Sequence, residues 1–312
     1  MKYFRRNHQP RSIGQVGISF SSSKLVLAHI FVKDKTPALE HISYIEGSGK
    51  KQASILKENV ERLNLQGAQA SVLLPSRDYQ IFLIEEPQVP EHEKREAIRW
   101  LVAEYIDFAI EEAVVDFIEL PRKVNNDATT MLYVIVAKRS KIDEVVTWVN
   151  ASDLTVKSID VCQSALRHIA MQLENSEEGQ ALLHFEEDRS HLILFKEKKL
   201  YMMRDIDLGL SMFEVEDSNQ EQHNYQDLSL EIQRSLDYCA SNLRNANISR
   251  LILTPLSGKK PRLLSHLSNL LGLPVREITF SEFLQVEDNL FLQDETMSTL
   301  AIGAALNQNQ NL

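Results

Sequence analysis

The sequence predicts an α/β fold of two similar lobes, with a small α+β subdomain inserted into the first lobe. Residues 12–44 and residues 181–206 each contain three short apolar runs separated by polar turns, a pattern typical of three consecutive strands. Helical and strand patterns alternate after each triplet. The repeated order indicates a duplicated unit. A helix with strands of its own inside 73–137 predicts the insertion.

The first lobe is expected to span residues 12–175 and to contain the insertion at 75–139. Its expected strands are 12–20, 25–32, 38–44, 70–74 and 156–161, and its expected helices cover 51–63, 142–149 and 166–173. The polar break at 175–179 marks the boundary.

The second lobe is expected to span residues 176–306. Its expected strands are 181–185, 192–195, 200–206, 251–253 and 275–278, and its expected helices cover 228–243 and 262–271, the second ending at Gly272. A polar stretch at 214–226 is expected to precede the longer helix. Residues 1–11 form a basic N-terminal tail, and residues 307–312 form a polar C-terminal tail.

The helix of the insertion opens at Pro90, followed by Glu91 and Glu93, residue types that suit a helix N-terminus. Its apolar residues recur at the spacing of one helical face: Ala97, Ile98, Leu101, Val102 and Tyr105. Strands are expected before it at 79–84 and after it at 113–120 and 131–137.

Composition places the chain among globular proteins of a reducing compartment. With 312 residues, 43% of them hydrophobic, it is long enough to bury two cores. The two cysteines, Cys162 and Cys239, lie in apolar helical patterns, as buried free thiols do. No apolar run approaches the ~20 residues that span a bilayer. We therefore expect a cytoplasmic protein.

Charge is distributed unevenly along the chain. The net charge is −10, yet the first acid is Asp34, after six Lys and Arg residues. The acidic body should repel nucleic acid and anionic lipid, and should attract short basic peptides. The tail at 1–6, basic with two aromatic residues, either contacts lipid headgroups or is a disordered soluble extension.

Several segments, in a specific order, carry a family resemblance. They are 89–90, 93–100, 104–106, 111–117, 159–161, 204–206, 231–238 and 271–275. The chain resembles the PilM family, actin-like cytoplasmic components of type IV pilus machines that are related to the cytoplasmic part of the secretion protein GspL. Within that family it is most similar to the branch of mannose-sensitive haemagglutinin (MSHA) pilus biogenesis. The resemblance implies an actin-like (ribonuclease H-like) fold with a PilM/FtsA-type insertion.

The resemblance also implies a nucleotide cleft between the lobes, whose loops are altered here. In the first phosphate loop, Ser19 stands for the acid, Ser21 stands for the second glycine, and Lys24 is retained. In the second loop, His184 replaces the acid and Glu186 replaces the glycine.

Acids in the second loop would repel a triphosphate, and no magnesium shell is evident. The adenosine loop keeps only Gly258. We therefore expect a vestigial nucleotide site, with no catalytic residue, ATP or magnesium. Backbone amides and Lys24 leave residual nucleotide binding open.

Two further pairs have residue types that occur in metal or catalytic sites. His184 and His191 lie across a turn with no third ligand in view, and are interpreted as a surface hairpin pair. Cys162 and His168 are interpreted as structural, because six positions place them on different helical faces. No metal site is expected.

In the PilM family, the cytoplasmic tail of a PilN-like bitopic inner-membrane protein docks between the first lobe and the insertion. By that resemblance, the candidate partner contacts are Arg77, Tyr79, Trp100 and Tyr105. Alternatively, Tyr79 and Tyr105 close the core of the insertion. The tail is expected to be extended and to mix basic with apolar residues.

The sequence thus predicts a cytoplasmic scaffold of a pilus assembly platform, peripheral to the inner membrane and without ATPase activity. Contacts with the assembly ATPase or other platform proteins, and a homodimer, are compatible with it. Two alternatives stay open. One is an actin-like ATPase whose nucleotide state controls assembly, and the other is an actin-like filament-forming protein.

Overall fold

The structure is a computed structural model of the 312-residue chain. It describes residues 14–20, 24–33, 36–47, 49–121, 130–173, 177–214, 218–242, 247–257, 261–286, 290 and 292–307. Both expected tails lie outside these residues except for Asn307, as do Ser21, Gly258 and the expected lobe boundary at 175.

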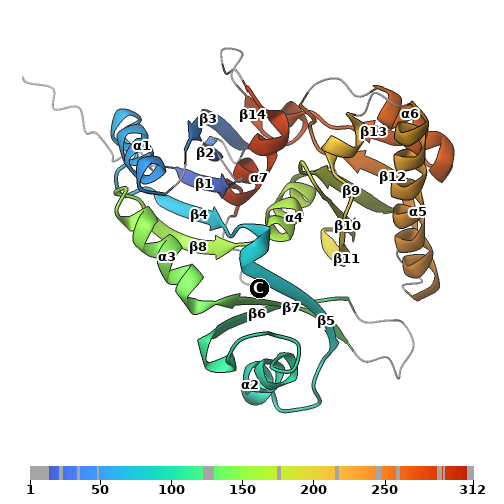
Figure 1. Ribbon diagram of the computed structural model, residues 1–312, viewed down its shortest axis with the longest axis horizontal. Coiled ribbons are helices and arrows are strands. Elements are labelled where there is room, and N and C mark those ends of the chain that lie inside the picture. Colours follow the sequence, from blue (N-terminus) through green and yellow to red (C-terminus); the bar gives the residue numbers. More distant parts are fainter. Residues whose placement is uncertain are drawn as a thin grey trace, which may run out of the picture.

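Two sheets of the same topology form the body of the molecule (Figure 1). The first has the order β14-β3-β2-β1-β4-β8, and the second has the order β11-β10-β9-β12-β13. In each, three antiparallel strands precede two parallel ones. The first sheet contains β1 (Gln15–Phe20), β2 (Lys24–Lys33), β3 (Thr36–Glu46), β4 (Gln69–Leu73), β8 (Thr155–Asp160) and β14 (Gln285–Val286). The second contains β9 (Gly179–Phe185), β10 (Ser190–Lys196), β11 (Lys199–Ile206), β12 (Ile248–Leu253) and β13 (Val275–Glu277).

Helices cover the outer face of each sheet (Figure 1). The first sheet carries α1 (Gly49–Arg62) and α3 (Arg139–Asn150), and the second carries α5 (Ser218–Asn242) and α6 (Pro261–Leu271). Because α5 starts at Ser218, the expected polar connection at 214–226 is wrong over most of its length. Its Tyr225 ring is buried and stacks on Phe213, which gives this polar-looking segment an apolar face.

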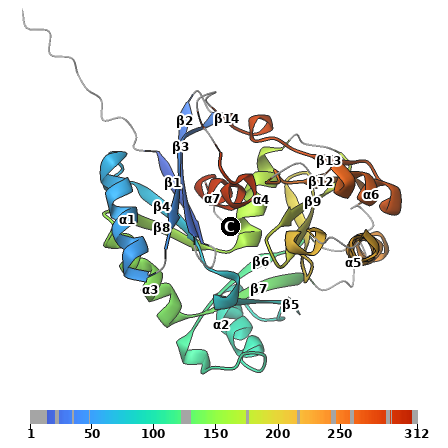
Figure 2. The ribbon, with the colours of Figure 1, turned by 45° about the horizontal axis from the view of Figure 1, so that its top comes forward.

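The two sheets are joined by α4 (Cys162–Gln172) and α7 (Glu295–Ala305), which pack against each other between them (Figure 2). One hydrophobic cluster includes Ala28 of the first sheet, Leu182 of the second, and both helices. The sequence analysis assigned 176–306 to the second lobe and predicted no helix at 295–305. In the structure, α7 packs on β1 and β2, and β14 pairs with β3. The chain therefore crosses back to the first lobe before it ends.

The insertion is a three-stranded antiparallel sheet of order β5-β7-β6, with one helix packed on it. It contains β5 (Tyr79–Glu85), α2 (Glu91–Val102), β6 (Ala113–Glu119) and β7 (Met131–Lys138). Short 3₁₀ helices lie at Ser76–Asp78, Ile110–Glu112, Leu210–Phe213 and Phe280–Glu282. The Tyr133 hydroxyl on β7 donates to the Met203 carbonyl at 2.8 Å and accepts from the Met203 amide at 3.0 Å, which ties the insertion to the second lobe.

A buried lysine fastens α2 to this sheet. The Lys94 side chain is 5% exposed, and its ammonium contacts Glu86 at 2.5 Å and also Glu119. Burial would lower the pKa of Lys94, but the bonds to these two carboxylates outweigh that effect and raise it. The lysine therefore stays charged, and the position of α2 is fixed.

Among the described residues, no helix is both long enough and apolar enough to cross a membrane.

Candidate functional site

Ser19 and His184, which stand in place of the two phosphate-loop acids, lie near the N-terminus of α7. Ser19 is buried at the end of β1, and its hydroxyl donates to the Met297 carbonyl at 3.4 Å. Asp294 caps α7: its carboxylate accepts from the Met297 amide at 2.9 Å and from the Ser257 hydroxyl at 2.6 Å. A helix N-terminus attracts anions, but here a carboxylate of the chain already occupies that position. The sequence analysis did not identify Asp294.

His184 is fully enclosed at the end of β9. Its Nδ1 lies 2.8 Å from the Thr254 hydroxyl, at the start of the loop that resembles an adenosine loop. Burial and the nearby charge of His191 lower the pKa of His184 to about 3. The imidazole is therefore neutral at physiological pH. Its contact with Thr254 joins the second phosphate loop to the loop that resembles an adenosine loop.

His191 lies directly opposite His184 in the β9–β10 pair, and the two rings stack with centroids 6.3 Å apart. Its Nδ1 is 2.7 Å from an Asp205 carboxylate oxygen, and its Nε2 is 3.6 Å from Glu186. Burial alone would lower the pKa of His191, but Cys162 and the two carboxylates outweigh it and raise the pKa well above the ordinary value.

The two carboxylates that flank His191 are held ionised. Burial would raise the pKa of Glu186 and of Asp205, but in each case the interaction with His191 outweighs burial and lowers the pKa. The turn that the sequence analysis treats as facing phosphate is thus engaged in an internal ion pair.

Hydrogen bonds connect the ion pairs of His191 to the insertion. The Gln163 amide on α4 donates to Asp205 at 2.8 Å, and the Tyr79 hydroxyl donates to the Gln163 carbonyl at 3.0 Å. Tyr79, Gln163, Asp205, His191 and Glu186, here called the interlobe network, therefore span the insertion, α4 and the second sheet.

These contacts bear on three interpretations of the sequence, and they correct the first of them. The His184–His191 pair is buried, at 1% and 0% exposure, and is not on the surface. Cys162 and His168 have separate surroundings, as the sequence predicts: Cys162 has His191 as its neighbour. His168 Nδ1 instead lies 3.1 Å from the Gly303 carbonyl oxygen. Of the two roles left open for Tyr79, the structure supports burial: Tyr79 is 8% exposed and its hydroxyl donates to Gln163. Its ring packs in a cluster with Leu74 and Val161, outside the main core of the insertion.

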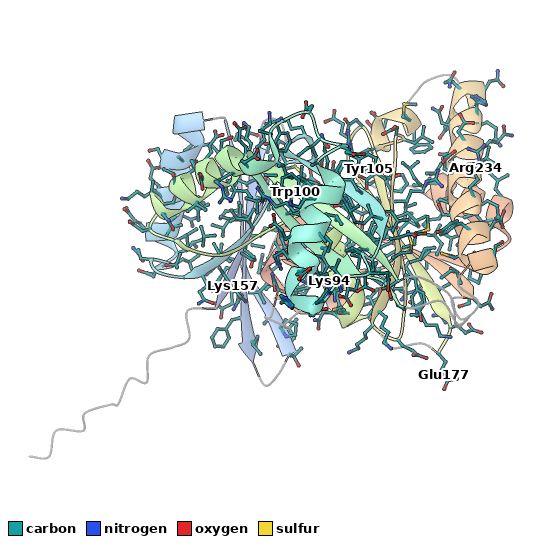
Figure 3. All side chains as sticks on the ribbon, turned by 90° about the horizontal axis from the view of Figure 1, so that it is seen from below. Lys94, Trp100, Tyr105, Lys157, Glu177 and Arg234 are labelled. Carbon is teal, nitrogen blue, oxygen red and sulfur yellow. The ribbon has the colours of Figure 1, made fainter. Side chains whose placement is uncertain are left out.

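Of the other candidate partner contacts, Arg77 is exposed at the start of the insertion. Trp100 and Tyr105 are 59% and 63% exposed, and Figure 3 shows both on the insertion. The centroid of the Tyr105 ring lies 5.7 Å from that of Phe82, with the two rings tilted. Leu101 is also exposed, at 45%. We call Trp100, Leu101 and Tyr105 the insertion surface.

An open groove of about 520 Å³ lies between the insertion and the second lobe. Ile81, Leu83 and Tyr133 line one side, and Met202, Met203 and Tyr238 line the other. Both β5 and β11, which border it, are edge strands of their sheets. The family resemblance implies docking between the first lobe and the insertion, whereas this groove lies between the insertion and the second lobe.

Lys24, which the resemblance retains as a phosphate contact, is half-buried at the start of β2. Ser19 and Asp294 both bond to Met297, and His184 interacts with Glu186 and Asp294, so these residues lie in one region. Trp100 and Tyr105 are both exposed on the insertion.

No protein family model matches the sequence, and no curated protein matches it. Solved structures do match in fold. One is a PilM-PilN type IV pilus biogenesis complex, with 20% identity, a TM-score of 0.70, and coverage of 95% of this chain and 98% of that chain. The chain has the actin-like fold. The cytoplasmic domain of EpsL, an inner-membrane component of the type II secretion system of Vibrio cholerae, matches with 14% identity, a TM-score of 0.52, and coverage of 94% of both chains.

Proposed function

We propose that this actin-like chain is a cytoplasmic scaffold of a type IV pilus assembly platform, of the MSHA branch to which MshI belongs. In this proposal it lies beneath the inner membrane and holds the cytoplasmic tail of a PilN-like bitopic protein. The shared fold with a PilM-PilN complex, over 95% of the chain, supports the assignment.

The observation that carries the proposal is the exposure of Trp100, on the firmly anchored helix α2, and of Tyr105, in the turn just after that helix. Exposed aromatic residues that cluster mark interaction sites, because their burial by a partner contributes much of the binding free energy. The ion pairs of Lys94 with Glu86 and Glu119 fix α2 on the sheet of the insertion, so the exposed surface is in place before a partner binds.

The charge around this surface indicates the chemistry of the partner. Exposed acids flank it on both sides along the chain: Glu91, Glu93, Glu96, Glu104, Asp107, Glu111 and Glu112. A tail that mixes Lys or Arg with apolar residues satisfies both features, because its cations meet these acids while its apolar side chains cover the aromatic rings. Cytoplasmic flanks of inner-membrane proteins are rich in such cations.

The proposal excludes ATPase activity. The positions that would hold phosphate carry Asp294 at the helix N-terminus and the ion pair of Glu186 with His191. A bound triphosphate would have to displace this pair and approach Asp294, both of which are unfavourable. Contacts with an assembly ATPase and self-association are further parts of the proposal, and size-exclusion chromatography with light scattering tests the second.

A titration of a fluorescent tail peptide tests the proposal. The wild-type chain should bind it with one site, and Trp100→Ala should weaken binding by about 30-fold or more, since loss of an anchor costs ~2–4 kcal/mol. Leu270→Ala is the matched control, because Leu270 is an exposed apolar residue of α6. If both variants bind within twofold of wild type, the insertion surface is not the docking site.

The two alternative functions, a regulatory ATPase and a filament-forming protein, predict different results when the same purified protein is tested for nucleotide binding and for sedimentation. A regulatory ATPase would bind magnesium-ATP and change its peptide affinity on doing so. A filament-forming protein would sediment above a critical concentration whether or not the peptide is present.

A further inference from the structure

We infer that Cys162, Glu186 and His191 form a binding site for a divalent transition-metal ion, Zn²⁺ being the best fit. Their ligand atoms, a sulfur, a carboxylate oxygen and an imidazole nitrogen, all lie within 4.8 Å of one another. Thiolate, imidazole and carboxylate are the ligands that zinc takes in proteins. This inference is independent of the proposed scaffold function.

The spacing fits an ion better than it fits a hydrogen bond. His191 Nε2 and the Glu186 oxygen are 3.6 Å apart, which is too long for a normal hydrogen bond. Zinc bonds of about 2.0–2.3 Å place tetrahedral ligand atoms about 3.3–3.6 Å apart. The side chain of His191 is fully buried, and its Nε2 has no hydrogen-bond partner among the described residues. A buried nitrogen of this kind calls for a ligand.

The outer contacts are those of a metal-binding histidine. His191 Nδ1 is 2.7 Å from Asp205, which fixes the ring with Nε2 toward Glu186, beside the Cys162 thiol. Gln163 in turn bonds Asp205, and Tyr79 bonds Gln163. The interlobe network thus supplies a second shell around the three ligands.

Binding balances in charge. Zn²⁺ replaces the thiol proton of Cys162 and the Nε2 proton of His191, so two protons leave as two positive charges enter. The Glu186 side chain is 27% exposed, which provides an entry path and room for a water molecule as fourth ligand. The ion would join α4 of the first lobe to β10 of the second.

No metal is expected from the sequence because His184 and His191 have no third ligand in view, and the structure supplies further ligands for His191. His184 and His191 lacked a third ligand in the sequence because Cys162 is 29 positions away from His191 in the chain. Folding brings the α4 N-terminus to this hairpin, and Cys162 with it. The residue that takes the place of a phosphate-loop glycine, Glu186, then becomes a ligand.

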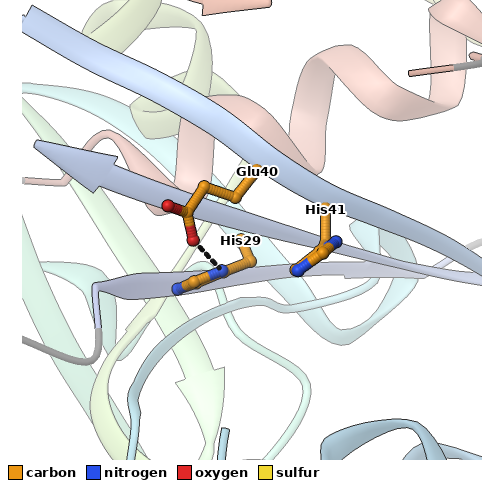
Figure 4. Close-up of side chains that lie close together, drawn as sticks. All are labelled: His29, Glu40 and His41. Carbon is orange, nitrogen blue, oxygen red and sulfur yellow. Dashed lines mark ion pairs between the residues drawn. The ribbon is translucent and has the colours of Figure 1, made fainter. Parts of the chain in front are cut away.

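A second group of suitable residues provides an internal comparison. His29, Glu40 and His41 also lie within 4.8 Å of one another, where a bulge between β2 and β3 brings Glu40 and His41 to the same partner (Figure 4). Glu40 and His41 are exposed, and the group contains no thiol. Cobalt spectra separate the two groups, because only a thiolate ligand gives a sulfur-to-cobalt charge-transfer band.

The test uses the full chain, stripped with a chelator and titrated with Co²⁺ and then with Zn²⁺. We expect one Co²⁺ per chain, tetrahedral d–d bands, a sulfur-to-cobalt charge-transfer band, and displacement of the cobalt by one equivalent of Zn²⁺. Cys162→Ser should abolish the charge-transfer band. Cys239→Ser, which alters the other buried thiol, should keep it, and so should His41→Gln.

A change at Asp205, which contacts the ligand His191 but not the ion, separates loss of metal affinity from loss of folding. Asp205→Asn should retain the charge-transfer band but weaken zinc binding by 10–100-fold. Circular dichroism verifies that each variant is folded. Zinc should raise the melting temperature of wild type and of Cys239→Ser, but not that of Cys162→Ser. Absence of a charge-transfer band in wild type, or its persistence in folded Cys162→Ser, would overturn the inference.

Discussion

A methyl group on Gly17 of β1 would overlap the carbonyl oxygen of Ala301 on α7. Gly17 begins the loop that resembles a phosphate loop, yet in this chain its lack of a side chain lets the C-terminal helix lie directly on the sheet. Gly303 of α7 has the same role toward α4, since a Cβ at Gly303 would lie 2.6 Å from the carbonyl oxygen of Ala165.

Gly17→Ala should therefore destabilise the protein by about 3 kcal/mol, because neither backbone can move away without disrupting the packing of α7. Urea denaturation measures this. Glu58→Ala, an exposed change on α1, serves as control and should stay within about 0.5 kcal/mol of wild type. An equally small effect of Gly17→Ala would show that α7 does not pack on β1 as described.

Tyr133 is expected to hold the insertion against the second lobe. Tyr133→Phe leaves the Met203 amide and carbonyl without their partner and should cost about 1–3 kcal/mol. The amides of β11 should exchange faster with solvent deuterium in this variant. Tyr105→Phe alters an exposed hydroxyl and should leave exchange unchanged; similar exchange in both variants would argue against the bridge.

Lys94→Ala should destabilise the insertion by about 3–5 kcal/mol, because it removes a buried cation that pairs with both Glu86 and Glu119. Lys57 pairs with Asp153 at 3.3 Å, but both side chains are nearly half exposed, so Lys57→Ala should cost less than about 1 kcal/mol. Thermal melts of the two variants give the comparison. Equal losses would mean that the burial of Lys94 contributes nothing to the stability of the insertion.

Acid should weaken the fold through His184. The pKa of His184 is lowered by burial to about 3 in the folded chain, whereas the unfolded chain takes up this proton near pH 6.5. The unfolded state thus binds more protons between these values, and stability falls as the pH is lowered, by up to about 1.4 kcal/mol per pH unit. His168, whose pKa is also lowered by burial, adds to the same slope.

Denaturation at pH 7, 6 and 5 should show that His184→Gln reduces this slope relative to wild type. The pH range stops above the region where Glu186 and Asp205 titrate, because their lowered pKa values act at lower pH. An unchanged slope in the variant would contradict the burial of His184.

The sequence predicted the duplicated strands and the insertion because each strand and helix there has an amphipathic or strongly apolar period. It could not predict α7. Eleven residues from Glu295 to Ala305 are covered almost all round, by β1, β2 and α4, so no polar face marks a helical period. The same physical reason hid the burial of His184 and His191, since β9 and β10 have apolar cores on both faces. The sequence left both a partner contact and a core position open for Tyr79, because Gln163, which accepts a hydrogen bond from its hydroxyl, is 84 positions away in the chain.

The most direct test of the account is a calorimetric titration of the full chain with the tail peptide of its neighbouring bitopic pilus protein, with and without magnesium-ATP. We predict one peptide site of unchanged affinity in both conditions and no binding heat from magnesium-ATP alone. A sub-millimolar ATP site, worth more than ~4 kcal/mol, or peptide binding that appears only with ATP, would contradict the account and favour a nucleotide-regulated ATPase.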